Sequence, residues 1–313
     1  MSWLEALVLG LVQGATEFIP VSSSGHLTLI PWLLNWSFEK DLKFAFDVLA
    51  HWGTLVAVLA VFWSDLWALA RGWLRTLGLA VRRSPEGTEA AFLMEGETDT
   101  IPKSEIIERP YAVNWRTFLA RVRADAEGRL AWLLLIGSVP AAVLGLLLEG
   151  FFEMLFGKPP IVSALLLVTA GLLTFSEWRG TQGRDLPALT WLDAILIGLG
   201  QATAIAPGIS RSGATMATGL MRGVRRDAAA RFSFLLSTPV IVGAGVWQLK
   251  DLFAQTGWTA NLLPLVIGFV AAAVSGYLCI RFLLSYLRRG KLYPFAVYCA
   301  LAGVACLIVA LVR

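Results

Sequence analysis

Six long apolar stretches dominate this sequence and limit the architectures that it can adopt. Each is long enough to cross about 30 Å of hydrocarbon as an α-helix. The composition agrees, because 57% of the 313 residues are hydrophobic and only 15% are charged, whereas soluble proteins carry about 25% charged residues. We predict an all-α polytopic membrane protein, a single integral membrane domain over 1–313, whose six transmembrane helices lie at approximately 46–70, 130–149, 160–177, 232–249, 262–286 and 293–312.

Two further apolar regions, 2–19 and 191–206, are each broken by a polar segment and followed by a second short apolar piece. A half-helix, a polar break and a second half-helix are typical of a re-entrant hairpin, which is tolerated at membrane depth only where it lines a cavity. We therefore predict re-entrant helical hairpins at 2–38 and 190–226. The breaks read Pro20 with Ser22-Ser23-Ser24-Gly25, and Pro207-Gly208 with Ser210-Arg211-Ser212-Gly213.

The two interrupted regions are copies of each other. A shift of 188 residues without a gap aligns nine identical residues between 2 and 25, which indicates a duplication. The first members of these identical pairs are Trp3, Leu4, Ala6, Gly10, Leu11, Gln13, Ser22, Ser24 and Gly25. The repeats then cover approximately 2–177 and 190–313. Each holds one hairpin and three crossings, and an odd number of crossings inverts the second unit, so we predict an inverted-topology repeat.

The distribution of basic residues predicts the orientation. If 71–129, 178–231 and 288–292 are cytoplasmic, that side carries 19 Lys and Arg residues and the opposite side carries five, as the positive-inside rule requires; Arg211 at the second break and Arg281 within a span are left out of this count. Loop 71–129 is then cytoplasmic, and the first hairpin enters the membrane from the outer side. Residues 82–127 form a soluble-looking cytoplasmic insert, better explained as a tolerated insertion than as a regulatory segment. The net charge of +4 forms no patch, so we predict no nucleic-acid partner.

The first break gathers acid, hydroxyl and imidazole groups. Gln13 and Glu17 are four residues apart and share one face of the half-helix. Pro20 ends that helix, and the serines that follow can cap the next one, leaving backbone N–H groups directed into the gap. His26 lies in the first turn beyond. The first tip is therefore a candidate catalytic site.

The second break brings Arg211 in place of the carboxylate. An arginine at this depth needs an anionic partner, and a guanidinium beside hydroxyls and helix N-terminal amides suits a phosphate. Phosphate oxygens would be repelled by Glu17 unless a divalent cation lay between them. Mg²⁺ or Ca²⁺ prefers oxygen ligands such as those of Glu17 and Gln13.

Simpler roles exist for the same residues. Glu17 and Arg211 could form a structural ion pair, each serine taken singly is well explained as a helix cap, and His26 could hydrogen-bond at the start of its helix. Asp47 and His51, also four residues apart, favour a structural or supporting role.

The two tips resemble the signatures of the undecaprenyl-pyrophosphate phosphatase family of the bacitracin-resistance type. The first family motif, Gln/Glu-x-x-x-Glu running into Pro-Val-Ser-Ser-x-Gly-His, is matched by Gln13, Glu17 and Pro20 to His26. The second, Pro-Gly-x-Ser-Arg-Ser-Gly-x-Thr, is matched by Pro207 through Thr215. Position 13 is Gln where many members have Glu. The span pattern also agrees, so the resemblance covers nearly the whole chain outside 82–127.

The resemblance implies a metal-dependent phosphatase of the bacterial cytoplasmic membrane. Such an enzyme hydrolyses undecaprenyl pyrophosphate to the monophosphate and inorganic phosphate, recycling the carrier lipid for cell-wall synthesis. The expected catalytic residues are Glu17, Ser23, His26 and Arg211, and the expected metal ligands are Glu17 and Gln13. The expected substrate-binding residues are Ser22, Ser24, Gly25, Ser210, Ser212, Gly213 and Thr215.

Two questions stay open at the level of sequence. Ser23 is the candidate nucleophile with His26 as its base or as the acid for the leaving group, and the rival is a metal-activated water. The alternative function is an inverted-repeat transporter or flippase for an anionic lipid, because broken helices in inverted repeats are also a transporter architecture. The expected partners are a polyprenyl pyrophosphate and membrane lipids, and the sequence is equally consistent with a monomer and a homodimer.

Overall fold

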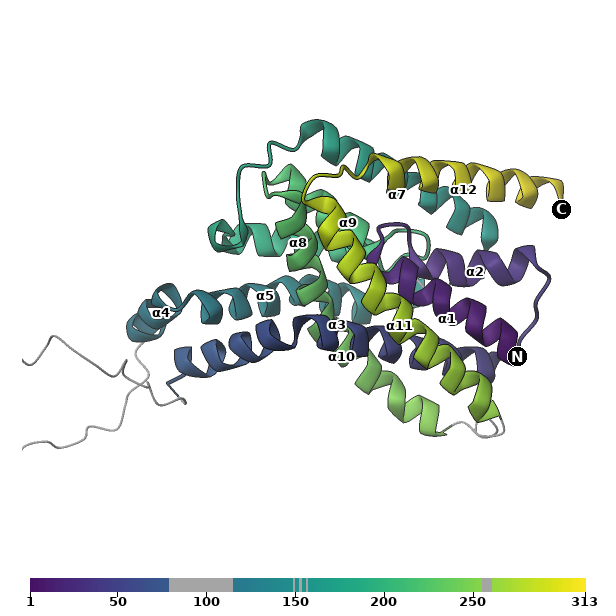
Figure 1. The fold of residues 1–313 in the computed structure, drawn as a ribbon, viewed down its shortest axis with the longest axis horizontal. Helices are drawn as coiled ribbons and strands as arrows, with labels where there is room; N and C mark the ends of the chain where they lie inside the picture. Colours follow the sequence, from purple (N-terminus) through teal and green to yellow (C-terminus); the bar gives the residue numbers. More distant parts are fainter. Residues whose placement is uncertain (79–114, 149, 152–153, 156, 255–260) are drawn as a thin grey trace, which may run out of the picture. The chain divides into compact units, whose positions relative to one another are not determined.

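The computed structural model describes residues 1–78, 115–148, 150–151, 154–155, 157–254 and 261–313 (Figure 1). Within these ranges the chain forms eleven α-helices and one short 3-10 helix, and its only β-type pairing is an isolated bridge between Arg184 and Val224. Six helices are long and apolar enough to cross a membrane, which confirms the six predicted spans. They are α3 (Lys40–Thr76), α5 (Ala126–Leu147), α7 (Pro159–Arg179), α10 (Arg226–Ala254), α11 (Leu262–Leu287) and α12 (Tyr293–Val312).

The described residues fall into two compact units, Met1–Leu66 with Leu133–Arg313, and Trp67–Trp132. The smaller unit contains α4 (Trp115–Ala124), which belongs to the predicted insert 82–127; residues 82–114 of that insert lie outside the described part.

An ion pair joins distant residues within the smaller unit. Arg75 donates hydrogen bonds to Asp125 at 2.6 Å and to Glu127 at 2.7 Å. The hydrogen bonds from Arg75 lower the pKa of the Asp125 carboxyl below its ordinary value, although partial burial opposes the shift.

Both interrupted regions form a pair of short helices in the larger unit. They are α1 (Trp3–Phe18) with α2 (Ser23–Leu33), and α8 (Trp191–Thr203) with α9 (Arg211–Met221). α1 and α8 both begin with a capping box, in which the cap side chain and the residue three positions later bond each other's backbone. α2 and α9 are capped by Ser22 and Ser210, which the shift of 188 residues places at equivalent positions.

Glycines let the short helices approach their neighbours closely. On α1, a Cβ added at Gly10 would lie 2.4 Å from the carbonyl oxygen of Gly268 on α11. On α8, a Cβ added at Gly198 would lie 2.2 Å from the carbonyl oxygen of Gly137 on α5. Figure 1 shows α1 beside α11, and α7 beside α12. The first helix of each copy therefore packs on a long helix of the other copy.

Buried ion pairs join the helix ends far from the breaks. Asp193 at the start of α8 is buried and accepts hydrogen bonds from Arg184 at 2.6 Å and from Arg222 at 2.7 Å. Glu177 at the end of α7 is also buried and accepts from Arg226 at 2.7 Å and from the backbone N–H of Leu292 at 2.7 Å. The contacts of Asp193 join the start of α8 to the end of α9, and those of Glu177 join the end of α7 to the starts of α10 and α12.

Candidate functional site

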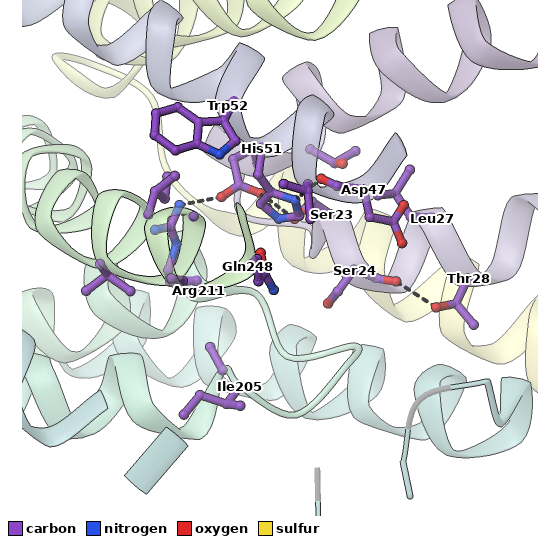
Figure 2. Close-up of a pocket in the computed structure, with 18 of the residues that line it drawn as sticks. Ser23, Ser24, Leu27, Thr28, Asp47, His51, Trp52, Ile205, Arg211 and Gln248 are labelled. Carbon is purple, nitrogen blue, oxygen red and sulfur yellow. Dashed lines mark hydrogen bonds and ion pairs between the residues drawn. The ribbon is translucent and has the colours of Figure 1, made fainter. Parts of the chain in front are cut away.

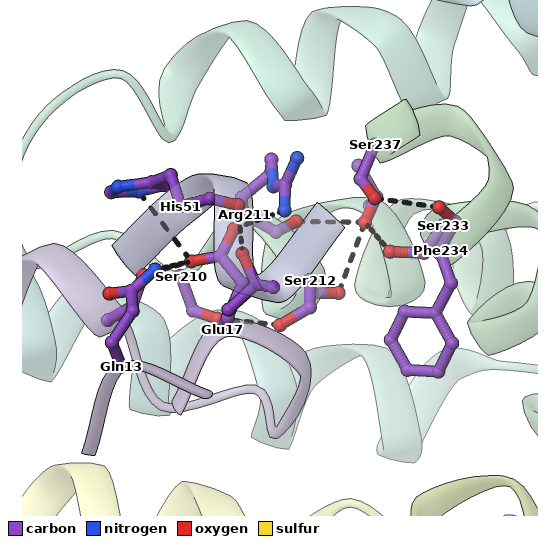
Figure 3. Close-up of polar contacts among 12 residues, drawn as sticks. Gln13, Glu17, His51, Ser210, Arg211, Ser212, Ser233, Phe234 and Ser237 are labelled. Carbon is purple, nitrogen blue, oxygen red and sulfur yellow. Dashed lines mark hydrogen bonds and ion pairs between the residues drawn. The ribbon is translucent and has the colours of Figure 1, made fainter. Parts of the chain in front are cut away.

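The two polar breaks meet in the larger unit. Arg211, the first residue of α9, donates a hydrogen bond to Glu17 in the last turn of α1 (Figure 3). The hydroxyl of Ser212 lies 3.4 Å from the backbone oxygen of Ile19. A Cβ added at Gly25 would lie 3.4 Å from the Cα of Gly208, so the backbones of the breaks touch as well. Residues almost 200 positions apart thus form one site.

Glu17 is the centre of this site. Its side chain is 5% exposed, and one carboxylate oxygen, Oε1, accepts from Arg211. The other oxygen, Oε2, accepts from the Ser23 hydroxyl at 2.6 Å and from the Gln13 amide at 3.0 Å. The Nε2 atom of His51 lies 3.9 Å from the same oxygen. A buried carboxylate with this many partners is expected to stay ionised and rigid.

A cavity of about 410 Å³ opens beside Glu17 (Figure 2). Its walls come from α1, α2, α3 and α10 and from the second break with the start of α9. Five residues predicted from the sequence line this cavity: Glu17, Ser23, Ser24, Ser210 and Arg211. The acid, the candidate nucleophile and the arginine therefore face a common space that is large enough for a small ligand.

Five predicted substrate-binding residues do not line this cavity: Ser22, Gly25, Ser212, Gly213 and Thr215. Ser22 and Ser210 cap α2 and α9, and their hydroxyls accept from the N–H groups of Gly25 at 3.2 Å and Gly213 at 3.0 Å. Those two N–H groups are therefore bonded within the tips. Ser22 has a φ of 71°, which is unusual for a residue other than glycine and marks a strained tip.

Two hydroxyls extend this supporting network. The hydroxyl of Ser212 lies 3.2 Å from that of Ser210, and Thr215 lies 2.6 Å from the hydroxyl of Ser233 on α10. Ser212 and Thr215 are both buried. Figure 3 shows this chain of polar contacts running from the second break to α10.

His26 occupies a different environment from the one its spacing suggests. It does not line the described cavity, and its ring stacks on Tyr298 with the centroids 5.7 Å apart. The Nδ1 atom lies 2.7 Å from the backbone oxygen of Ser22, and the Nε2 atom lies 2.7 Å from the Tyr298 hydroxyl. Both ring nitrogens thus have partners other than Ser23, whose hydroxyl donates to Glu17.

α3 contributes a polar face to the site. The sequence predicted a structural or supporting role for two of its residues, Asp47 and His51, and no role for Lys43. Lys43, Asp47 and His51 follow each other at intervals of four residues and all line the cavity. Lys43 donates to both carboxylate oxygens of Asp47, at 2.7 and 2.5 Å, and the Nδ1 atom of His51 lies 2.7 Å from the Asp47 backbone oxygen. The spacing was visible in the sequence, but only the fold directs this face toward Glu17.

Gln13 and Glu17 offer oxygen ligands of the kind that a divalent cation prefers. Gln13 Oε1 is buried beside Glu17 and has no hydrogen-bond partner. The described residues contain no group of three or more His, Cys, Asp or Glu side chains that could hold a metal. Mg²⁺ is commonly bound by one or two carboxylates together with substrate phosphates. Glu17 and Gln13 match that pattern, and not that of a closed protein cage.

Comparison with known proteins identifies the family. The family model described as "Bacitracin resistance protein BacA" matches residues 6–305. The chain belongs to this family. BacA relatives named undecaprenyl-diphosphatase occur in Desulforudis audaxviator, 39% identical over 100% of both chains, and in Moorella thermoacetica, 40% identical over 95% of this chain and 94% of the relative. A third, from Methanosphaera stadtmanae, is 36% identical over 99% of this chain and 98% of its own length.

Proposed function

We propose that this BacA-family protein hydrolyses undecaprenyl pyrophosphate to undecaprenyl phosphate and inorganic phosphate. The reaction recycles the carrier lipid for cell-wall synthesis and thereby confers resistance to bacitracin. The observation that carries the proposal is the convergence of Glu17, Ser23 and Arg211 on one cavity, together with the name that the relatives share. That name does not favour the alternative of a transporter or flippase.

The geometry supports a direct role for each of the three residues. Arg211 binds the terminal phosphoryl group and offsets the charge that develops on it. Ser23 Oγ attacks the terminal phosphorus, the bond to the bridging oxygen breaks, and undecaprenyl phosphate leaves. Glu17 Oε2, at 2.6 Å, orients the Ser23 hydroxyl and is placed to receive its proton. Water then hydrolyses the phosphoserine, which releases inorganic phosphate and restores the serine.

His26 and the cation have secondary places in this proposal. The contacts of His26 with Ser22 and Tyr298 favour a role in holding the tip. The geometry therefore favours Glu17 over His26 as the group that accepts the proton, and proton transfer by His26 stays a prediction. Gln13 and Glu17 would hold a divalent cation, Mg²⁺ or Ca²⁺, which would neutralise pyrophosphate oxygens.

The charges that line the cavity also favour a cation. Two side chains are acidic and two are basic, so they leave no excess positive charge for the substrate: Glu17, Asp47, Lys43 and Arg211.

We also propose that the two pairs of short helices are re-entrant hairpins of an inverted repeat. The lengths of α1, α2, α8 and α9 support this, as do the matching serine caps and the reciprocal glycine contacts. In the orientation that the basic residues favour, the first hairpin enters from the outer side, where an externally exposed pyrophosphate is reached.

The test is phosphate release from farnesyl pyrophosphate by purified protein in detergent, with Mg²⁺, with Ca²⁺ and with neither. Arg211→Ala should abolish release, whereas Arg281→Ala removes an exposed arginine that contacts Tyr277 and should leave release intact. If a folded wild-type protein released no phosphate with either cation, the proposal of hydrolysis would be wrong and an anion-transport role would take its place.

A further inference from the structure

A pyrophosphate ester carries two phosphoryl groups, but the proposed mechanism uses only one arginine. Arg211 and Lys43 are the only lysine or arginine side chains among the described residues that line the cavity. Arg211 lies beside Glu17 and Ser23, where the terminal phosphoryl group is attacked. Lys43 therefore provides the second cationic position, and nothing in the reaction described above employs it.

The contacts of Lys43 leave it able to bind an anion. A lysine ammonium group has three N–H donors. Two of them are directed to the carboxylate oxygens of Asp47, at 2.7 and 2.5 Å, which leaves one donor for a further acceptor. The side chain is 29% exposed, so a ligand in the cavity reaches it without unfolding the wall. Asp47 holds the lysine in position and does not need to be displaced.

The surroundings of Lys43 suit the phosphate that carries the lipid. The side chains of Lys43 and Asp47 are 29% and 33% exposed, so the cavity is open at the Lys43 end, whereas the Glu17 side chain is 5% exposed. A polyprenyl chain exceeds a cavity of about 410 Å³ and must leave through the open end. Leu27 and Phe44 provide apolar surface in the same wall as Lys43.

We propose that Lys43 binds the lipid-linked phosphate of the substrate while Arg211 binds the terminal phosphoryl group. This inference rests on the proposed hydrolysis of undecaprenyl pyrophosphate and assigns a second subsite within the same cavity. Lys43 thereby distinguishes a pyrophosphate ester from inorganic phosphate, which requires only the Arg211 position. It also binds the lipid phosphate product, so it contributes to product inhibition.

The experiment compares Lys43→Met with Lys40→Met in the farnesyl pyrophosphate assay. Lys40 is exposed on the first turn of the same helix and does not line the cavity, so its removal reproduces the change in net charge alone. Lys43→Met should lower kcat/KM by about tenfold or more, as expected for the loss of a charge-assisted hydrogen bond. Inhibition by farnesyl phosphate should weaken by a similar factor, and inhibition by inorganic phosphate should not change. Lys40→Met should match the wild type in all three measurements.

Several results would overturn the inference. Equal effects of Lys43→Met and Lys40→Met would reduce the role of Lys43 to long-range attraction. Weaker inhibition by inorganic phosphate with unchanged inhibition by farnesyl phosphate would place the terminal phosphoryl group at Lys43 instead. Lys43→Arg, which keeps the charge, should recover most of the loss, and Lys43→Gln gives a second uncharged variant if the methionine variant is unstable. An inactive wild type would instead refute the proposed hydrolysis itself.

Discussion

Three buried carboxylates of this protein, Glu17, Asp193 and Glu177, differ in their surroundings. Glu17 is shared between Ser23, Gln13 and Arg211 at the edge of a cavity, so its charge is available to a ligand. Asp193 accepts from two arginines, Glu177 accepts from Arg226 and a backbone N–H group, and neither carboxylate lines the cavity beside the breaks. Burial and ion pairing alone therefore do not mark a functional carboxylate; the open space beside Glu17 does.

Substitution of Asp193 should reduce stability and leave catalysis intact. Asp193→Ala removes the shared partner of Arg184 and Arg222, which are themselves 31% and 37% exposed, and should cost about 1.5–3 kcal/mol of unfolding free energy. Asp185→Ala is the control, because that side chain is 58% exposed and its loss should cost about 1 kcal/mol or less. Thermal unfolding in detergent measures both. A folded Asp193→Ala protein with a changed KM would contradict this division of roles.

Ser23→Ala should remove the proposed nucleophile. We expect kcat to fall by about 10³-fold or more, because residues that act as a catalytic unit are lost together. Ser138→Ala is the control, since that hydroxyl only bonds the Leu134 carbonyl within its own helix. Acid-quenched turnover of the wild type should trap a phosphoserine at Ser23. A slow but active Ser23→Ala protein, without any trapped phosphoserine in the wild type, would favour attack by water.

At the scale of helices, the position of the Glu17 carboxylate depends on how closely α1 packs on α11. Gly10 permits this approach, and Gly14 one turn later does the same against Ser275 and Ala272. Glu17 is three residues beyond Gly14, so a shift of α1 moves the carboxylate relative to Arg211. Packing at these glycines is thereby linked to the chemistry at the tip.

Gly10→Ala should impair both stability and activity. The new Cβ would lie 2.4 Å from a backbone oxygen that cannot rotate away, and such overpacking costs about 1–3 kcal/mol. Gly171→Ala is the matched control on α7, because a Cβ there meets nothing within 4 Å and should be neutral or stabilising by up to about 1 kcal/mol. The melting temperature and the kcat/KM of the two variants are compared with those of the wild type. Equal behaviour of the two variants would show that the crossing tolerates a side chain.

At the scale of the whole molecule, the proposed orientation in the membrane rests on the distribution of charge. Basic residues gather in the segments that the positive-inside rule assigns to the cytoplasm. Within the larger unit, buried ion pairs of Asp193 and Glu177 tie those same helix ends together. One end of this unit is thus rich in paired arginines, and the substrate cavity opens among α2, α3 and α10.

Cysteine labelling tests that orientation. Cys279, Cys299 and Cys306 are first replaced, and a single cysteine is introduced at exposed Lys40 or exposed Arg289. A membrane-impermeant thiol reagent should label Lys40→Cys in intact cells, and Arg289→Cys only after permeabilisation. The opposite pattern would invert the proposed topology.

Much of the architecture was predictable from the sequence, because hydrophobic length and charge act locally along the chain. The six spans follow from apolar runs, and the positions of the two breaks follow from proline, glycine and serine. The choice of Glu17, Ser23 and Arg211 followed from the family motifs and from the chemistry of an arginine that needs an anion. An ion pair between Glu17 and Arg211 was one role considered for them, and the two residues do form a hydrogen bond.

Only the tertiary structure decided which side chains share the cavity. The sequence places His26 three residues after Ser23, but packing turns it to Tyr298, and the Ser23 hydroxyl bonds Glu17 instead. Lys43 lies far from both breaks in the sequence, and it reaches the cavity only because α3 packs beside them. Local spacing determines which residues share a helix face. The direction of that face depends on contacts between distant segments, which no local pattern contains.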